Sequence, residues 1–264
     1  MYNFNINFFI IMQDIYLGDT GKGFPLVLVH GFLGSSKMWE PQIEYLKKEY
    51  RIITPDLPGF GKSNKLKSCK SIKSMAQSIL VSLKKKKINK FYLLGHSMGG
   101  MIAQEMVKIS EEKILKLICY GTGPVGDIPG RFETMDESRK KLKKNGLEIT
   151  ANAIAKTWFV KKSKSKYFYL CRNAGKATSL KAADNAFIAM KKWNGLYNLK
   201  NIKIPTFIIW GELDKSYNFN QVDRLHKKII GSKIKILKKC SHNAHLEIPN
   251  EFNKNILKFL KRNC

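Results

Sequence analysis

One serine stands in a setting that would make it a nucleophile. Ser97 lies in the stretch Gly95-His96-Ser97-Met98-Gly99, between an apolar run and a segment with helical periodicity. A serine on such a sharp strand-to-helix turn has a strained backbone and an exposed hydroxyl, and it needs small residues two before and two after it. The G-x-S-x-G spacing also differs from the G-x-G-x-x-G of nucleotide-binding turns. We therefore predict that Ser97 is a catalytic nucleophile.

A serine hydroxyl is a weak nucleophile, so it needs a general base within hydrogen-bond reach and an acid that orients the base. Among five histidines, we favour His242 as the base, because it comes first in the loop that leaves the last predicted strand. The turn of Ser97 is expected at the same end of the sheet. The alternative, His245, is expected to pack at the start of the next helix.

The acid is expected at the end of the apolar strand before that loop. Asp214 ends the stretch Trp210-Gly211-Glu212-Leu213-Asp214, 28 residues before His242. Glu212 is the alternative, whereas Asp223 is expected on a solvated helix. The order serine, aspartate, histidine is the one described for α/β-hydrolases and differs from both common serine-protease orders.

Acyl transfer also needs backbone N–H donors for the developing oxyanion, and loss of one donor lowers the rate on the order of 10²–10³-fold. The Met98 N–H at the start of the helix is one candidate. The second is the Phe32 N–H in the Gly-rich turn His30-Gly31-Phe32-Leu33-Gly34. Phe32 and Met98 are therefore the predicted oxyanion hole.

The elements that must position these residues alternate between strands and helices, which predicts an α/β fold with a mostly parallel sheet covered on both faces. Residues 18–21 are expected to form a turn after the second strand. Apolar patterning predicts eight strands near residues 4–8, 14–17, 26–29, 51–54, 91–94, 115–120, 205–210 and 233–237. Helices are expected near residues 39–48, 72–86, 100–109 and 250–262.

Strand patterning disappears between residues 126 and 200, where Lys-rich amphipathic helices are expected near 133–144, 148–160 and 179–193. We predict a helical cap there, inserted into a core made of residues 1–125 and 201–264. Aromatic and Met side chains of the cap either line the acyl pocket or pack the interior of the cap. The predicted pocket residues are Trp158, Phe159, Phe187, Met190 and Trp193, with Tyr167, Phe168 and Tyr169 as further candidates.

These motifs together resemble the α/β-hydrolase fold superfamily over essentially the whole chain. The matching pieces are residues 30–34, 55–63, 95–100, 211–214 and 241–249. The resemblance implies a central, mostly parallel eight-stranded sheet with a cap inserted after the sixth strand. Within the superfamily the chain is similar to carboxylesterases and enol-lactonases that use no cofactor and no metal.

The function that this resemblance implies is hydrolysis of a small carboxylic ester or lactone through an acyl-enzyme. Two alternatives stay open. The same site could cleave carbon–carbon bonds or act as a lyase, as some relatives of this fold do. A non-catalytic ligand-binding module is the third reading.

Basic residues exceed acidic ones by 48 to 20, a formal charge of +28. Of the basic residues 42 are Lys and only 6 are Arg, whereas nucleic-acid recognition usually depends on Arg. Residues 126–200 hold 17 basic and 6 acidic residues, so the charge is only modestly denser there. We interpret most of it as surface Lys from compositional bias and expect no nucleic-acid partner, although cap lysines could attract anionic or carrier-bound substrates.

Compartment and assembly are less constrained by the sequence. The five cysteines show no metal-binding or disulfide spacing, which favours reduced thiols in a cytoplasmic protein. No apolar run approaches the roughly 18–20 residues of a membrane span, so no membrane association is expected. The chain is expected to be a monomer or a homodimer.

Overall fold

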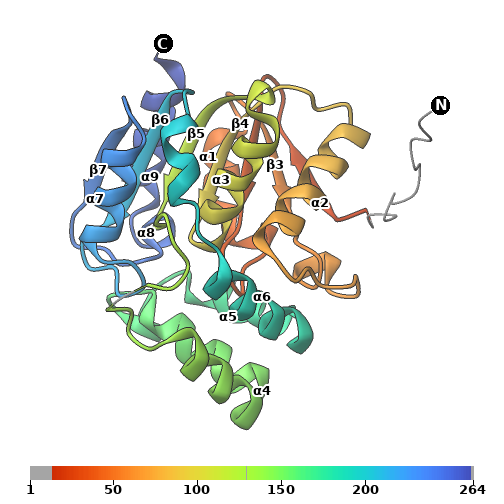
Figure 1. The fold of residues 1–264 in the computed structure, drawn as a ribbon, viewed down its shortest axis with the longest axis vertical. Coiled ribbons are helices and arrows are strands. Elements are labelled where there is room, and N and C mark those ends of the chain that lie inside the picture. Colours follow the sequence, from red (N-terminus) through yellow and green to blue (C-terminus); the bar gives the residue numbers. More distant parts are fainter. Residues whose placement is uncertain (1–13, 129, 263–264) are drawn as a thin grey trace, which may run out of the picture.

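The computed structural model describes residues 14–128 and 130–262. It contains one seven-stranded sheet in the order β1-β3-β2-β4-β5-β6-β7 (Figure 1). All neighbouring strands are parallel except β1, which is antiparallel to β3. The strands are β1 (Leu17–Thr20), β2 (Pro25–Val29), β3 (Arg51–Pro55), β4 (Phe91–His96), β5 (Ile114–Tyr120), β6 (Thr206–Gly211) and β7 (Lys233–Leu237). The predicted α/β architecture with a mostly parallel sheet is confirmed, and six of the eight predicted strands coincide with β2 to β7.

The N-terminal strands are where prediction and structure differ. The strand predicted at residues 4–8 lies outside the described residues. The strand predicted at 14–17 with a turn at 18–21 is wrong, because β1 runs over Leu17–Thr20. The predicted turn residues extend because they pair with β3, where Asp19 also accepts hydrogen bonds from the Arg51 guanidinium. Cross-strand pairing overrode the turn preference of this sequence.

Two layers of helices bury the two faces of the sheet. On one face lie α2 (Ile72–Lys85), α3 (Met98–Ser110) and α7 (Phe219–Lys228). On the other lie α1 (Glu40–Leu46) and α9 (Pro249–Lys261). The central strands are apolar throughout because both of their faces are covered. Each helical layer packs against its face of the sheet and buries one hydrophobic cluster there.

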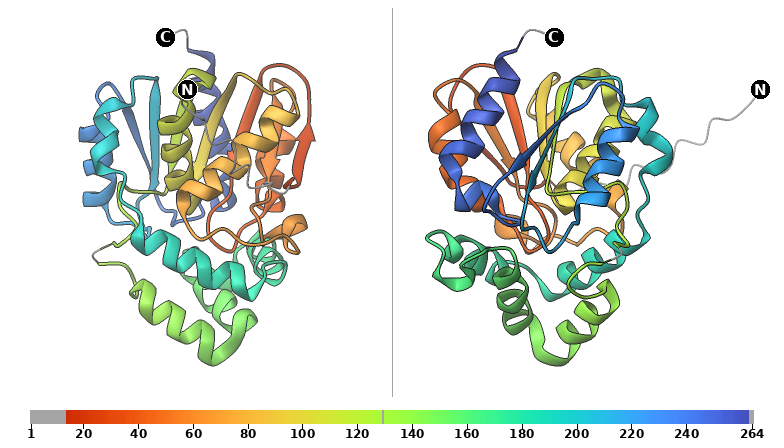
Figure 2. Two further views of the ribbon diagram at one scale, coloured as in Figure 1. Left: turned by 45° about the vertical axis from the view of Figure 1, so that its right-hand side comes forward. Right: turned by 90° about the vertical axis from the view of Figure 1, so that its left-hand side faces the viewer.

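Residues 126–200 leave this sandwich and form a separate group of helices. They are α4 (Met135–Thr157), α5 (Phe168–Lys176) and α6 (Leu180–Lys192), gathered below the end of the sheet where the parallel strands finish (Figure 2). Gly146 interrupts α4 with φ 77° and ψ 174°, so the two helices predicted on either side of it are both present. Helix α5 was not predicted. The buried side chains of these helices continue the hydrophobic cluster around α2 and α3.

Among the described residues, no helix is both long and apolar enough to cross a membrane.

Candidate active site

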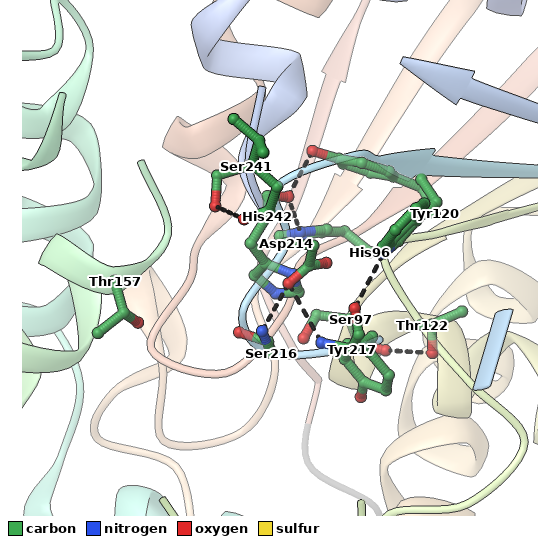
Figure 3. A network of polar contacts seen from close by, with 12 residues as sticks. His96, Ser97, Tyr120, Thr122, Thr157, Asp214, Ser216, Tyr217, Ser241 and His242 are labelled. Carbon is green, nitrogen blue, oxygen red and sulfur yellow. Dashed lines mark hydrogen bonds and ion pairs between the residues drawn. The ribbon is translucent and has the colours of Figure 1, made fainter. Parts of the chain in front are cut away.

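Ser97 occupies the sharp turn between β4 and α3. Its backbone has φ 55° and ψ −119°, a conformation that residues other than glycine rarely adopt. The turn is held from β5, since the Ser97 N–H donates to the Tyr120 carbonyl at 2.9 Å and the Thr122 hydroxyl donates to the Ser97 carbonyl at 2.9 Å. Figure 3 shows these contacts. Packing therefore over-determines the strained turn that presents the serine.

The two glycines of the motif are required by close backbone contacts. A Cβ on Gly95 would lie 2.2 Å from the Gly99 carbonyl oxygen. A Cβ on Gly99 would lie 2.3 Å from the Val29 carbonyl oxygen of β2. Both distances are far below van der Waals contact, so larger residues would push α3 away from the sheet.

His242 and Asp214 meet beside this turn. His242 Nδ1 donates to Asp214 Oδ2 at 2.7 Å, and both side chains are almost fully buried. The other oxygen, Asp214 Oδ1, accepts the N–H groups of Ser216 at 2.6 Å and Tyr217 at 3.2 Å. Both oxygens of this buried carboxylate therefore accept hydrogen bonds.

The backbone of His242 is fixed from behind by two more side chains. Its carbonyl accepts the Tyr120 hydroxyl at 2.7 Å and His96 Nε2 at 3.2 Å. The His96 ring lies 4.7 Å from the His242 ring, centroid to centroid. Burial first, and then the neighbouring His242 and His245, hold the pKa of His96 well below its ordinary value, so this ring stays neutral.

The two alternative residues lie in other surroundings. His245 is fully buried in α8 (Ala244–Glu247), with Nδ1 3.1 Å from the Tyr120 hydroxyl, and burial lowers its pKa to about 3. Its packing at the start of a helix agrees with the prediction. The Glu212 carboxylate instead pairs with Lys238 at 2.7 Å. Neither alternative takes part in the His242–Asp214 contact.

The predicted oxyanion loop approaches the serine closely. A Cβ on Gly31 would lie 3.0 Å from the Ser97 Cβ, so the turn passes directly beside the nucleophile. His30 braces this turn, since its Nε2 accepts the Leu57 N–H at 3.2 Å and its Nδ1 lies 2.8 Å from the Gly31 carbonyl oxygen. Phe32 follows in the same turn, and Met98 is the first residue of α3.

Only part of the predicted pocket contacts these residues. The Trp158 ring lies 6.0 Å from the His242 ring, and the Phe187 ring lies 4.4 Å from the Phe32 ring. Phe159 instead packs against Phe168 inside the 126–200 segment. Trp193 Nε1 donates to Glu105 of α3 at 3.1 Å, which directs this side chain to the sheet body. Met190, near the end of α6, is buried in the same hydrophobic cluster.

Tyr217 is a site residue that sequence reasoning missed. Its ring stacks on the His242 ring at 5.9 Å and 17°. Burial raises the pKa of its hydroxyl, followed by the nearby Asp214 charge, while hydrogen bonding with the Ser97 and Thr122 hydroxyls acts in the opposite direction. The phenol therefore stays protonated beside the predicted nucleophile. A lone Tyr three residues after an acid carries no sequence signal for this placement.

Within residues 14–128 and 130–262, no group of three or more His, Cys, Asp and Glu side chains is arranged to hold a metal ion.

Comparison with known proteins places this geometry in a family. Residues 25–249 match the family model described as alpha/beta hydrolase fold. A pimeloyl-[acyl-carrier protein] methyl ester esterase of Legionella pneumophila (strain Corby) is 31% identical over 207 residues, covering 76% of this chain and 80% of the relative. The monoacylglycerol lipase ABHD6 of Bos taurus is 25% identical, covering 93% and 77%.

Solved structures agree. An esterase from Exiguobacterium antarcticum superposes with a TM-score of 0.86 at 26% identity, covering 94% of this chain and 96% of that one. The enol-lactonase from Burkholderia xenovorans LB400 has the same fold, with a TM-score of 0.85 at 22% identity and coverage of 94% and 96%. This chain is a hydrolase that belongs to the alpha/beta hydrolase family.

Proposed function

We propose that the protein hydrolyses a small carboxylic ester or lactone through an acyl-enzyme on Ser97. The observation that carries the proposal is the 2.7 Å contact between His242 Nδ1 and Asp214 Oδ2 beside the strained turn of Ser97. With Nδ1–H bound to the carboxylate, the lone pair of the neutral ring is on Nε2, the atom that must accept the serine proton.

In the acylation step, Ser97 Oγ attacks the carbonyl carbon while His242 Nε2 takes its proton. The carbonyl oxygen becomes an oxyanion, which the N–H groups of Phe32 and Met98 stabilise. Asp214 stabilises the imidazolium through the Nδ1–H bond. The imidazolium then protonates the leaving alcohol as the tetrahedral intermediate collapses to the ester of Ser97.

In the deacylation step, His242 removes a proton from water, and the hydroxide attacks the acyl carbon. Collapse of the second intermediate returns the proton to Ser97 Oγ and releases the carboxylic acid. A lactone substrate follows the same steps, with the alcohol remaining attached to the acyl group. The two carboxylate oxygens of Asp214 keep their partners throughout.

We further propose that residues 126–200 form a cap over the site and that the substrate is anionic or borne on an acidic carrier. Two observations support this. The relative from Legionella is named as an esterase of a carrier-bound methyl ester. Lysines 161, 162, 164 and 166 follow directly after the Trp158 turn, whose ring faces His242, and all four are exposed.

Replacement of Ser97 by Ala tests the reaction. We expect kcat/KM for p-nitrophenyl esters to fall by about 10⁴-fold or more, because attack by the acyl-forming oxygen is lost. Covalent labelling by a fluorophosphonate should disappear with it. The matched control is Ser78→Ala. Ser78 is also a buried serine, but it lies on α2, and its replacement should leave turnover unchanged. Undiminished turnover in Ser97→Ala would overturn the proposed reaction.

A further inference from the structure

The Glu247 carboxylate joins two segments that lie far apart in the sequence. Its Oε1 accepts the Val160 N–H at 2.8 Å, and its Oε2 accepts the Ser241 N–H at 2.6 Å. Within the described part of the chain, Glu247 forms no salt bridge with a Lys or Arg side chain, although the chain is rich in Lys. This half-buried carboxylate is therefore devoted to backbone N–H donors from two segments.

The segments that Glu247 joins are the end of α4 and the loop of His242. Val160 lies three residues after the end of α4, and Ser241 directly precedes His242. On the other side of the histidine, the Asn243 N–H donates to the Trp158 carbonyl at 3.0 Å. The backbone is thus tied to the proposed cap immediately before and immediately after His242.

These ties also reach the loop of Asp214. The Ser241 hydroxyl donates to the Leu213 carbonyl at 3.1 Å, and the Asn243 side-chain amide contacts the Cys171 sulfur of α5 at 3.2 Å. Charge-assisted hydrogen bonds to a carboxylate are stronger than bonds between neutral groups. Among the contacts named above between the His242 loop and the proposed cap, the bridge through Glu247 is the one that includes a charged group.

We propose that Glu247 is a positioning residue that couples the cap to the proposed base, so that the seating of the end of α4 sets the position of His242. The inference rests on the proposed function for its kinetic consequence, but the link itself does not need it. Burial raises the pKa of Glu247, and the two N–H donors act against that shift, so both bonds favour the charged form. A small displacement of His242 would lengthen its reach to Ser97, and misplacements near 1 Å can lower rates on the order of 10²-fold.

The first test is Glu247→Gln. An amide has one acceptor oxygen, so one N–H donor would face the NH₂ group instead. We expect kcat for p-nitrophenyl acetate to fall on the order of tenfold with KM within twofold of wild type, because the base is displaced while the pocket is retained. Glu247→Asp keeps both acceptor oxygens and should recover part of kcat. The matched control is Glu111→Gln, since Glu111 also bridges two segments by accepting the Lys203 N–H at 2.8 Å, at the other end of the sheet.

A second pair of variants breaks the link from the cap side. Val160→Pro removes the donor N–H, whereas Val160→Ala keeps it, and the Val160 side chain is exposed, so the Ala change should be neutral. Val160→Pro should reproduce the loss of kcat seen in Glu247→Gln. The double variant should be no slower than the slower single variant, because both changes remove the same link.

Hydrogen exchange separates the link from the reaction. In Glu247→Gln, the amides of Ser241 and Val160 should exchange faster together, with unchanged exchange in the strands of the sheet. Unchanged exchange at both amides would overturn the proposal, as would additive losses in the double variant or a rise in KM without loss of kcat. If wild type neither turns over esters nor is labelled at Ser97 while both amides respond, the link stands and the proposed reaction fails.

Discussion

The sheet side of the site and the proposed cap, residues 126–200, are held in place by different interactions. On the sheet side, the Ser97 N–H and the His242 carbonyl are hydrogen-bonded to Tyr120 at the end of β5, and the Asp214 carboxylate accepts two backbone N–H groups of its own loop. On the cap side, the helices are held by apolar packing, with ion pairs at the surface such as Lys191–Asp136 and Lys176–Glu148. Directional hydrogen bonds fix the positions of individual atoms, whereas apolar packing and surface ion pairs mainly stabilise the association of the helices.

The difference shows which residue types each side tolerates. A Cβ at Gly95 would collide with backbone, so the turn admits one residue type there. Apolar positions of the cap accept many residues of similar volume, and exposed ion pairs contribute little stability, typically about 0–1 kcal/mol each. The sheet side therefore tolerates few substitutions at the turn of Ser97, whereas the packing of the proposed cap tolerates many.

The largest effect on stability should come from the contact between Phe187 and Phe32, which joins the proposed cap to the sheet side. Phe187 of α6 is fully buried against Phe32, and Phe187→Ala should lower the free energy of unfolding by about 3–5 kcal/mol. Because one hydrophobic cluster spans both sides, circular dichroism and Trp fluorescence should report a single urea transition. Tyr197→Ala is the control, since this ring is 85% exposed and its loss should change stability by no more than about 0.5 kcal/mol. Two separate transitions would mean that the cap unfolds on its own.

A smaller effect on stability should come from the buried His245 on the sheet side when the pH is lowered. Burial lowers the pKa of His245 to about 3, whereas the unfolded chain binds the proton near the ordinary value of about 6.5. Its contribution is therefore complete above about pH 6.5 and is lost as the pH falls from there toward 3. Between pH 7 and pH 5 this one histidine should remove about 2 kcal/mol of stability.

Urea unfolding at both pH values measures this contribution. His245→Asn should lose about 2 kcal/mol less than wild type between pH 7 and pH 5, whatever its stability at pH 7. An equal loss in both proteins would show that His245 is protonated in the fold, contrary to its buried surroundings beside Tyr120.

The smallest effect concerns the charge of the cap. Changing Lys161, Lys162 and Lys164 to Glu should raise KM for a methyl ester borne on acyl carrier protein about fivefold at low salt, since exposed charges act within a Debye length of about 10 Å at 0.1 M. The matched control changes Lys84, Lys86 and Lys87 to Glu as well. These lysines are exposed at the end of α2. The KM for p-nitrophenyl acetate should change in neither variant. Equal effects of the two triple changes on the carrier ester would reject a docking role for the cap.

Much of the sheet side could be predicted from the sequence because each of its features is local. The turn of Ser97 follows from two glycines and an apolar strand, and the order of Ser97, Asp214 and His242 follows from which strand each one ends. The position of β1 could not be predicted, because Gly18 and Asp19 favour a turn in isolation and become extended only when they pair with β3. Register and edge pairing depend on residues distant in the chain.

The surroundings of the site were predicted less well for the same reason. Tyr217 and Glu247 act through neighbours that are near them only in the fold. Aromatic residues of the proposed cap contact different surfaces: the Trp158 and Phe187 rings lie near His242 and Phe32, whereas Trp193 contacts Glu105. Helical periodicity identifies a buried face but does not say which buried surface the face meets.

The break in α4 has a stereochemical consequence. Gly146 combines φ 77° with ψ 174°, a region essentially closed to L-residues, although a Cβ there would meet nothing within 4 Å. The restriction at this position is one of handedness rather than of space. Any L-residue would favour joining residues 135–157 into one straight rod, which would swing the half that carries Leu142 out of its packing. The angle between the two halves of α4 in the proposed cap therefore depends on glycine at position 146. A substitution there would change the direction of a helix although the new side chain would clash with nothing.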